Sequence, residues 1–82
     1  MRAKITVTTH NGHVLRFDAR EVKSTSGYGN DTYIRIDTED NLFEYVDARY
    51  VIGYDFAQVL KERFETYYGD NLKCLEIVTK EN

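Results

Sequence analysis

Asp18-Ala19-Arg20-Glu21-Val22 occurs a second time as Asp47-Ala48-Arg49-Tyr50-Val51, 29 residues further along the chain. The similarity extends backwards without a gap, so that residues 5–22 align with residues 34–51. Two copies are fewer than a solenoid array requires, so the repeat indicates one duplicated unit within a single domain of residues 1–82. We interpret each copy as a β-hairpin followed by a tight polar turn at Asp-Ala-Arg, which passes the chain to the next strand.

The composition is that of a small globular domain. With 82 residues, the chain is near the lower size limit for a self-sufficient core. Its hydrophobic share of 41% and aromatic share of 13% exclude an intrinsically disordered chain. No apolar run approaches the roughly 20 residues that span a bilayer, and the N-terminus lacks the apolar stretch of a signal peptide. The single cysteine fits a reducing compartment, so we expect a cytoplasmic protein without membrane contact.

The first copy predicts a hairpin whose register can be argued from burial. Ile5 lies in a run that alternates apolar and polar residues, which indicates a half-buried strand, and Asn11-Gly12 is a strong turn signal. A two-residue loop would place Ile5 opposite Asp18, whereas a three-residue loop places it opposite Phe17. Burial favours the three-residue loop, which requires a positive φ at Gly12.

The second copy predicts another hairpin, with a loop at residues 39–41, and here the two copies conflict. The register of the repeat places Ile36 opposite the charged Glu44, whereas a four-residue loop places it opposite Phe43. We favour the register of the repeat, with Phe43 and Tyr45 on this hairpin partly covered. Such local conflicts tend to mark functional or strained places.

The C-terminal third predicts a helix followed by a last strand. Asp55 is a candidate N-cap, and Gln58 completes a capping box. Apolar residues then follow at helical spacing over residues 56–68, and Gly69 ends the helix. We expect residues 72–79 to form the last strand, added at an edge of the sheet.

Further strands are predicted around residues 21–25 and 50–54, each directly after one copy of the Asp-Ala-Arg turn. Together with the hairpins, they predict an α+β fold that is mostly antiparallel β. Its six or seven short strands form a meander, and strands this short and twisted tend to curl into a small barrel or roll. The helix of residues 56–68 packs on this sheet.

The net charge of −3 hides an acidic centre. Residues 31–55 carry seven acidic residues against two basic ones, while the remainder of the chain is slightly basic. An acidic centre repels phosphate and favours basic partners, and no basic footprint for nucleic acid is evident. Acids at hairpin tips also keep a small domain soluble, which is the simpler explanation.

No residue pattern points to catalysis or to a bound cofactor. His10 and His13 flank the first turn, but zinc sites need at least three protein ligands, and the sequence places no third one beside them. Cys74 alternates with Glu76 and Val78 in a strand, without the base and the oxyanion donor that a catalytic thiolate needs. We therefore expect a non-enzymatic protein without metal or cofactor.

The residues expected to bind a partner lie in and beside the acidic hairpin, residues 37–47. Tyr28 stands between two glycines in a loop where its ring is difficult to bury, and tyrosine is enriched at binding hot spots. The acids would speed encounter with a basic surface, and the rings would supply a buried anchor. The predicted partner-binding residues are Tyr28, Asp37, Glu39, Asp40, Phe43, Glu44, Tyr45 and Asp47.

These features favour a small interaction or regulatory module that binds a basic protein surface. In size and charge alone, it is comparable with inhibitors from viruses and mobile elements that occupy the basic channels of nucleic-acid-handling enzymes. The first alternative is a nucleic-acid-binding barrel, although the acidic centre counts against it. Its phosphate-binding residues would be Arg2, Lys4, Arg16, Arg20 and Lys23. The second alternative is an oligomerisation subunit whose edge strands pair between copies.

Overall fold

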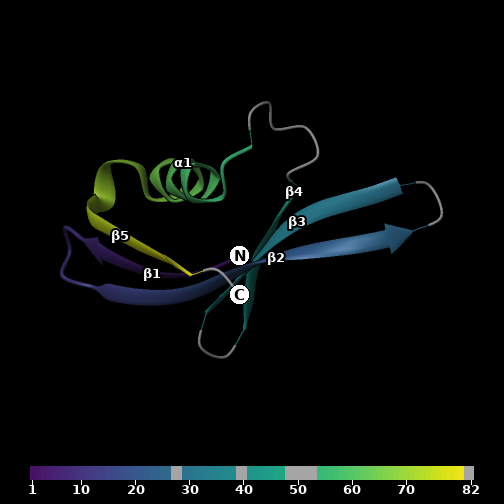
Figure 1. The fold of residues 1–82 in the computed structure, drawn as a ribbon. Helices are drawn as coiled ribbons and strands as arrows, with labels where there is room; N and C mark the ends of the chain where they lie inside the picture. The colour runs from purple at the N-terminus through teal and green to yellow at the C-terminus, as the bar shows by residue number, and fades with distance from the viewer. Residues whose placement is uncertain (27–28, 39–40, 48–53, 81–82) are drawn as a thin grey trace.

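The structure is a computed structural model of the chain, and it describes residues 1–26, 29–38, 41–47 and 54–80. Within these residues, the elements in chain order are the strands β1 (Arg2–Thr9), β2 (Val14–Ser26), β3 (Gly29–Thr38) and β4 (Leu42–Asp47), the helix α1 (Phe56–Tyr68), the short 3-10 helix η1 (Gly69–Asn71) and the strand β5 (Leu72–Lys80). The strands form one antiparallel sheet in the order β4-β3-β2-β1-β5, and α1 lies over one of its faces (Figure 1).

The fold is α+β with an antiparallel sheet and one C-terminal helix, but the predicted barrel is wrong. The described residues form an open sheet of five strands, with β4 and β5 at its two edges. Six or seven strands were expected, and the count falls partly because Asp18-Ala19-Arg20 continues β2 instead of turning the chain. The strand predicted at residues 50–54 lies almost entirely outside the described residues.

Strand β2 stays extended through the predicted turn because both of its edges are paired there. Ala19 lies opposite Ala3 of β1 on one side and Ile36 of β3 on the other, and its side chain is 2% exposed. Asp18 and Arg20 alternate to the opposite face and are exposed. A turn at this place would remove backbone hydrogen bonds from both neighbouring strands. Asp18 and Arg20 instead occupy solvent-facing positions of a continuous strand.

The first half of the repeat forms the hairpin of β1 and β2 in the predicted register. Ile5 lies opposite Phe17, and Gly12 has a φ of 89°. The N–H of Thr9 donates to the His13 carbonyl at 2.9 Å, and the N–H of Gly12 donates to the Thr9 carbonyl at 3.1 Å. Glycine is needed at this position because a side chain at a positive φ collides with its own backbone.

The second half of the repeat forms the hairpin of β3 and β4. Ile36 lies opposite Glu44, which confirms the register of the repeat. The pairing then shifts by one residue, so that Asp37 lies opposite Leu42. Such a bulge changes the direction of the side chains that follow it. As a result, Phe43 and Glu44 both contact α1, although they are neighbours in sequence.

Helix α1 begins and ends where the sequence predicts. The Asp55 carboxylate accepts a hydrogen bond from the Gln58 amide at 3.1 Å, which satisfies one of the N–H groups that a helix start leaves unpaired. The Gln58 side chain donates to Glu62 in the next turn, so of the predicted capping box the described contacts show only the half made by Asp55. Gly69, with a φ of 54°, ends the helix and donates its N–H to the Glu65 carbonyl.

The core fills the space between α1 and the sheet. Its fully buried side chains are Ile5, Val7, Ile34, Ile36, Leu60 and Phe64. Phe64 is central, because its ring centroid lies 5.0 Å from that of Phe17 and 6.3 Å from those of Phe43 and Tyr68. The opposite face of the sheet, called the uncovered face below, has no described element packed on it (Figure 1). Among the described residues, no helix has the length and the apolarity needed to cross a membrane.

Candidate functional site

The uncovered face carries a row of cations that crosses four strands. The odd-numbered residues of β1 are buried under α1, so its even-numbered residues point to the uncovered face. Strand pairing aligns Arg2 with Lys80 of β5 and Arg20 of β2, and Arg20 with Arg35 of β3. We call Lys80, Arg2, Arg20 and Arg35 the cationic row. Neighbouring strands lie about 4.8 Å apart, so the row brings four cations within roughly 15 Å.

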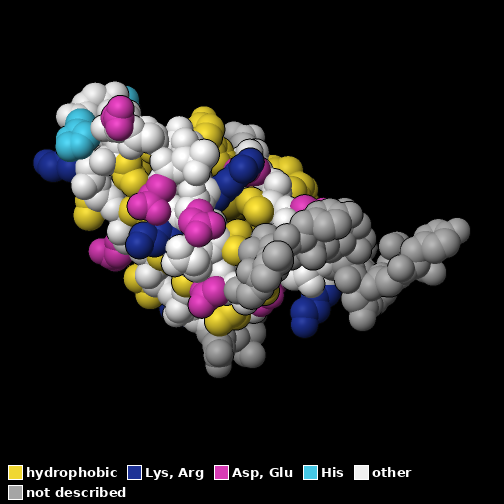
Figure 2. Space-filling model, turned by 90° about the horizontal axis from the view of Figure 1, so that it is seen from above, with side chains coloured by type: hydrophobic (Ala, Val, Ile, Leu, Met, Phe, Trp, Pro, Cys, Tyr) yellow, Lys and Arg dark blue, Asp and Glu magenta, His cyan; other side chains and the backbone are white. Residues whose placement is uncertain are grey.

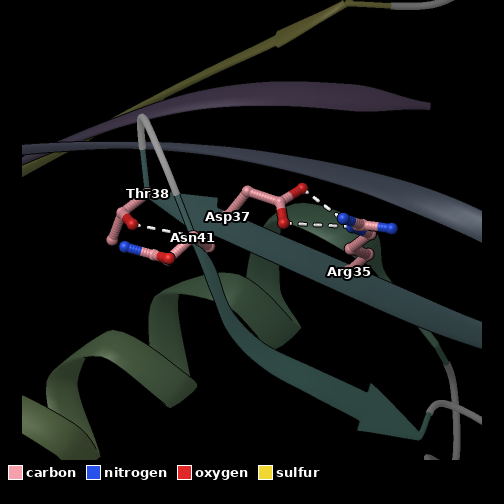
Figure 3. A network of polar contacts seen from close by, with 4 residues as sticks. All are labelled: Arg35, Asp37, Thr38 and Asn41. Atoms are coloured by element: carbon pink, nitrogen blue, oxygen red, sulfur yellow. Dashed lines mark hydrogen bonds and ion pairs between the residues drawn. The ribbon is translucent and has the colours of Figure 1, made fainter.

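The cationic row opposes folding, since like charges directly opposite each other on a sheet repel. Within the part of the chain that the structure describes, Arg2, Arg20 and Lys80 form no ion pair. Arg35 differs, because its Nε donates to both Asp37 carboxylate oxygens at 3.0 and 2.9 Å, and this contact raises the pKa of Arg35 (Figure 3). Local arrangements that oppose folding are expected at functional or strained sites.

Two adjoining depressions lie beside the cationic row. The first has a volume of about 520 Å³, and its charged lining residues are Arg2, Lys4, Asp18, Arg20, Asp37 and Lys80. The second has a volume of about 660 Å³, and its charged lining residues are Lys4, Arg16, Asp18, Glu76 and Lys80. Lys4, Asp18 and Lys80 line both, so the depressions form one trough in which cations outnumber carboxylates.

The helix side of the molecule has a different charge pattern. There, the described acidic and basic side chains lie interspersed with apolar ones (Figure 2). Mixed charges of this kind are expected on a surface that only keeps a domain soluble. On the uncovered face, in contrast, strand pairing aligns the four cations of the row, with Asp18, Asp37 and Glu76 beside them.

The acidic hairpin distributes its side chains over both faces of the sheet. Phe43 is half-buried, and its ring packs among the aromatic rings of the core. Glu44 forms an ion pair with Arg63 of α1. Tyr45, in contrast, is 52% exposed and lies opposite Arg35 on the uncovered face, where it continues the cationic row.

The described acids of this hairpin are held by groups of the same domain. Asp37 binds Arg35 beside the turn, where Thr38 donates through its N–H and its hydroxyl to the Asn41 carbonyl at 2.8 and 3.0 Å (Figure 3). Asp47 ends β4 opposite Tyr33. The described part of the hairpin therefore presents less unpaired negative charge than its sequence suggests. The predicted site residues Tyr28, Glu39 and Asp40 lie outside the described residues.

The structure brings together four of the five cations named for the nucleic-acid alternative. Those on the uncovered face are Arg2, Lys4, Arg16 and Arg20. Because side chains alternate between the two faces along β2, Lys23 lies on the other face of the sheet, as Ala19 does. Sequence reasoning missed Lys80 and Arg35, because the row exists only once three strand pairings are known. The available signal was the alternation in β1, which places Arg2 and Lys4 on its polar side.

The other candidate residues lie apart from this face or from one another. His10 and His13 are exposed at the turn between β1 and β2. Among the described residues, no three His, Cys, Asp or Glu side chains come together as ligands for a metal ion. Cys74 is an exposed free thiol on β5, opposite Thr8.

Glu21 anchors the start of β1, which carries Arg2 and Lys4. Its carboxylate pairs with the amino group of Met1 at 3.2 Å and accepts a hydrogen bond from the Tyr54 hydroxyl at 3.2 Å. Its N–H donates to the Met1 carbonyl at 3.0 Å. Burial, together with the nearby Glu21 carboxylate, raises the pKa of Tyr54 well above its ordinary value.

This raised pKa makes the stability of the domain sensitive to alkaline pH. The folded state holds the Tyr54 proton more tightly than the unfolded state does. Its contribution to stability is therefore complete below the unfolded pKa of about 10, and it is lost as pH rises toward the higher folded value. We expect the unfolding free energy of Tyr54→Phe, measured in urea between about pH 8 and pH 11, to fall less steeply than that of the parent.

Tyr54→Phe removes the hydroxyl but keeps the ring, which packs against the core. A change in the dependence on pH therefore reports the loss of the hydroxyl. If Tyr54→Phe and the parent lose stability along parallel curves, the hydrogen bond between Tyr54 and Glu21 does not contribute in solution.

Comparison of the chain with protein-family models, with curated proteins and with solved structures finds no match. No relative therefore supplies an activity, a substrate or a partner.

Proposed function

We propose that this domain is a non-enzymatic interaction module that binds single-stranded nucleic acid across the uncovered face of its sheet. The observation that carries the proposal is the cationic row, in which Arg2 and Arg20 lie opposite each other without a neutralising partner among the described residues. Guanidinium groups are well suited to phosphate oxygens, because their planar donors match them in geometry. A series of phosphates fits a row of cations better than one isolated anion does.

An exposed ring at one end of the row favours a single strand over a duplex. Tyr45 lies opposite Arg35, and half of its surface is open to solvent. An aromatic ring can stack on an unpaired base, whereas the bases of a duplex are already stacked on one another. The trough beside the row provides the space for a sugar-phosphate backbone. Since the net charge of the chain is −3, we expect modest affinity that is strongest at low salt.

The dependence of binding on salt tests the proposal. A fluorescent oligothymidylate is titrated with protein, and the dissociation constant is measured by anisotropy at increasing sodium chloride. If the row engages about four phosphates, the logarithm of the binding constant should fall with the logarithm of salt with a slope of about −2.8. The double variant Arg2→Gln with Arg20→Gln removes two of the cations. Its slope should be less negative than that of the parent by about 1.4.

The control for this experiment is Lys23→Gln with Lys61→Gln, which changes the net charge equally but leaves the uncovered face intact. It should keep the parental slope. Parental protein that does not bind at low salt, or equal losses in the two double variants, would overturn the proposal. Binding of polyglutamate in preference to oligothymidylate would assign the face to an acidic protein instead.

The acidic hairpin supports a second candidate, in which the module regulates or inhibits a protein with a basic surface. Leu42 and Tyr45 are 47% and 52% exposed on the edge strand β4, so this hairpin offers apolar surface beside its acids. Capture of a basic protein that is lost in Tyr45→Ser, but kept in Arg2→Gln with Arg20→Gln, would favour this candidate. For either function we propose a cytoplasmic location, because the exposed thiol of Cys74 suits a reducing compartment.

A further inference from the structure

The two edges of the sheet differ in length and in regularity. The edge strand β5 has nine residues, and its pairing with β1 is continuous from Cys74 to Lys80. The edge strand β4 has six residues, and a register shift interrupts its pairing with β3. Among the described residues, no strand lies beyond β5, so one side of this strand presents unpaired backbone N–H and C=O groups. A long, regular edge is a template for pairing with another chain.

We propose that β5 pairs antiparallel with β5 of a second copy of this chain, about a two-fold axis at Val78. This proposal does not depend on the binding of nucleic acid. In such a pairing, the same surface is used by both copies, and each contact occurs twice. With the axis at Val78, the valine faces its own counterpart, and Glu76 of each copy faces Lys80 of the other. Both helices then lie on the same side of one continuous sheet.

Charge distinguishes this register from its neighbours. An axis at Glu76 would place two carboxylates opposite each other, which is destabilising. An axis at Ile77 would place Glu76 opposite Val78, and Lys80 opposite Cys74, so neither charge would have a partner of opposite sign. The axis at Val78 pairs both charges and covers a valine side chain that is 47% exposed.

The same register relieves a repulsion within the cationic row. In one copy, Lys80 lies opposite Arg2, and no described side chain forms an ion pair with it. In the dimer, Glu76 of the second copy would lie on the other side of Lys80 and provide the opposite charge. Arg2 and Arg20 would stay open on the uncovered face. Because a single strand supplies only a small interface, we expect a weak dimer that forms with rising concentration.

Charge reversal tests the pairing in solution without nucleic acid. Sedimentation equilibrium of the full chain, from about 5 to about 500 µM, should show a mass that rises from that of one copy toward that of two. Glu76→Lys alone or Lys80→Glu alone should shift dimerisation to at least about tenfold higher concentration, because each change brings like charges together. The double variant, Glu76→Lys with Lys80→Glu, should restore it. Lys73→Glu lies outside the proposed pairing and is the matched control.

A disulfide across the two-fold axis gives a second measurement. In a Cys74→Ser background, Val78→Cys places each new thiol opposite its counterpart, so mild oxidation should yield a covalent dimer. Thr79→Cys faces Ile77 in this register and should cross-link poorly. A parent that stays monomeric up to the highest concentration, or a double reversal that does not restore dimerisation, would overturn the proposal. Equal cross-linking at residues 78 and 79 would overturn the register.

Discussion

Phe64→Ala should lower the free energy of unfolding by about 3–5 kcal/mol, the usual cost of truncating a buried aromatic side chain. Phe64 is 1% exposed, and its ring lies 5.0 Å from that of Phe17 of β2. Its ring also lies 6.3 Å from that of Phe43 of β4, so one side chain of α1 connects two strands that are not adjacent in the sheet. Truncation would leave a cavity that the paired strands cannot close, because their spacing is set by backbone hydrogen bonds.

Urea denaturation followed by circular dichroism measures this loss. The matched control is Thr66→Ala on the same helix, since Thr66 is exposed and its truncation should cost less than about 1 kcal/mol. A loss for Phe64→Ala as small as that of the control would mean that α1 packs on the sheet through another face.

Arg20→Glu should weaken oligothymidylate binding by about 10- to 100-fold at low salt and, at the same time, stabilise the fold. Arg20 lies between Arg2 and Arg35 in the sheet, so a carboxylate at this position would attract both cations, although the nearby Asp18 and Asp37 would offset part of the gain. We expect the free energy of unfolding to rise by a few tenths of a kcal/mol, and by at most about 1 kcal/mol. Opposite effects on binding and on stability are the expected signature of a side chain selected for a ligand.

Anisotropy titration and urea denaturation of the same preparation measure both effects. Lys61→Glu makes an equal change of charge on the exposed side of α1, and it should alter neither quantity strongly. If Arg20→Glu destabilises the domain and leaves binding unchanged, the cationic row serves the fold, and the proposed nucleic-acid surface is wrong.

The parts of the fold that follow from neighbouring residues could be predicted from the sequence. Asp55 and Gly69 mark the two ends of α1 through contacts within four residues, so the sequence contains the whole signal. The turn at Gly12 is equally local. The register of both hairpins followed from which residues had to be buried, because a slip by one residue exchanges the two faces.

The course of β2 depended on residues that are distant in sequence. Asp18-Ala19-Arg20 has the composition of a polar turn, yet the same alternation suits a strand with a small buried side chain at its centre. Ala3 and Ile36, on the two neighbouring strands, decide between these possibilities. The sheet also stays open, because α1 already covers the apolar face that a closed barrel would otherwise bury.

The candidate site was harder to predict than the fold, since charge along the chain is a poor guide to charge on the surface. The acidic centre of the sequence is partly neutralised within the domain, where Arg35 holds Asp37 and Arg63 holds Glu44. The cations of the uncovered face, in contrast, are scattered from Arg2 to Lys80 in sequence. Strand β1 pairs with β2 and with β5, and β2 pairs with β3. Only these three pairings bring the cations together on a single surface.

The pairing of β1 with β5 has a consequence for the order in which the chain folds. The pairings of β1 with β2, β2 with β3 and β3 with β4 join strands that are consecutive along the chain. The pairing of Arg2 with Lys80 joins residues that are 78 positions apart, so among the described strand pairings it closes the longest loop and loses the most chain entropy (Figure 1). We therefore expect Lys80 to come into place beside Arg2 late in folding, so that the row is complete only in fully folded molecules.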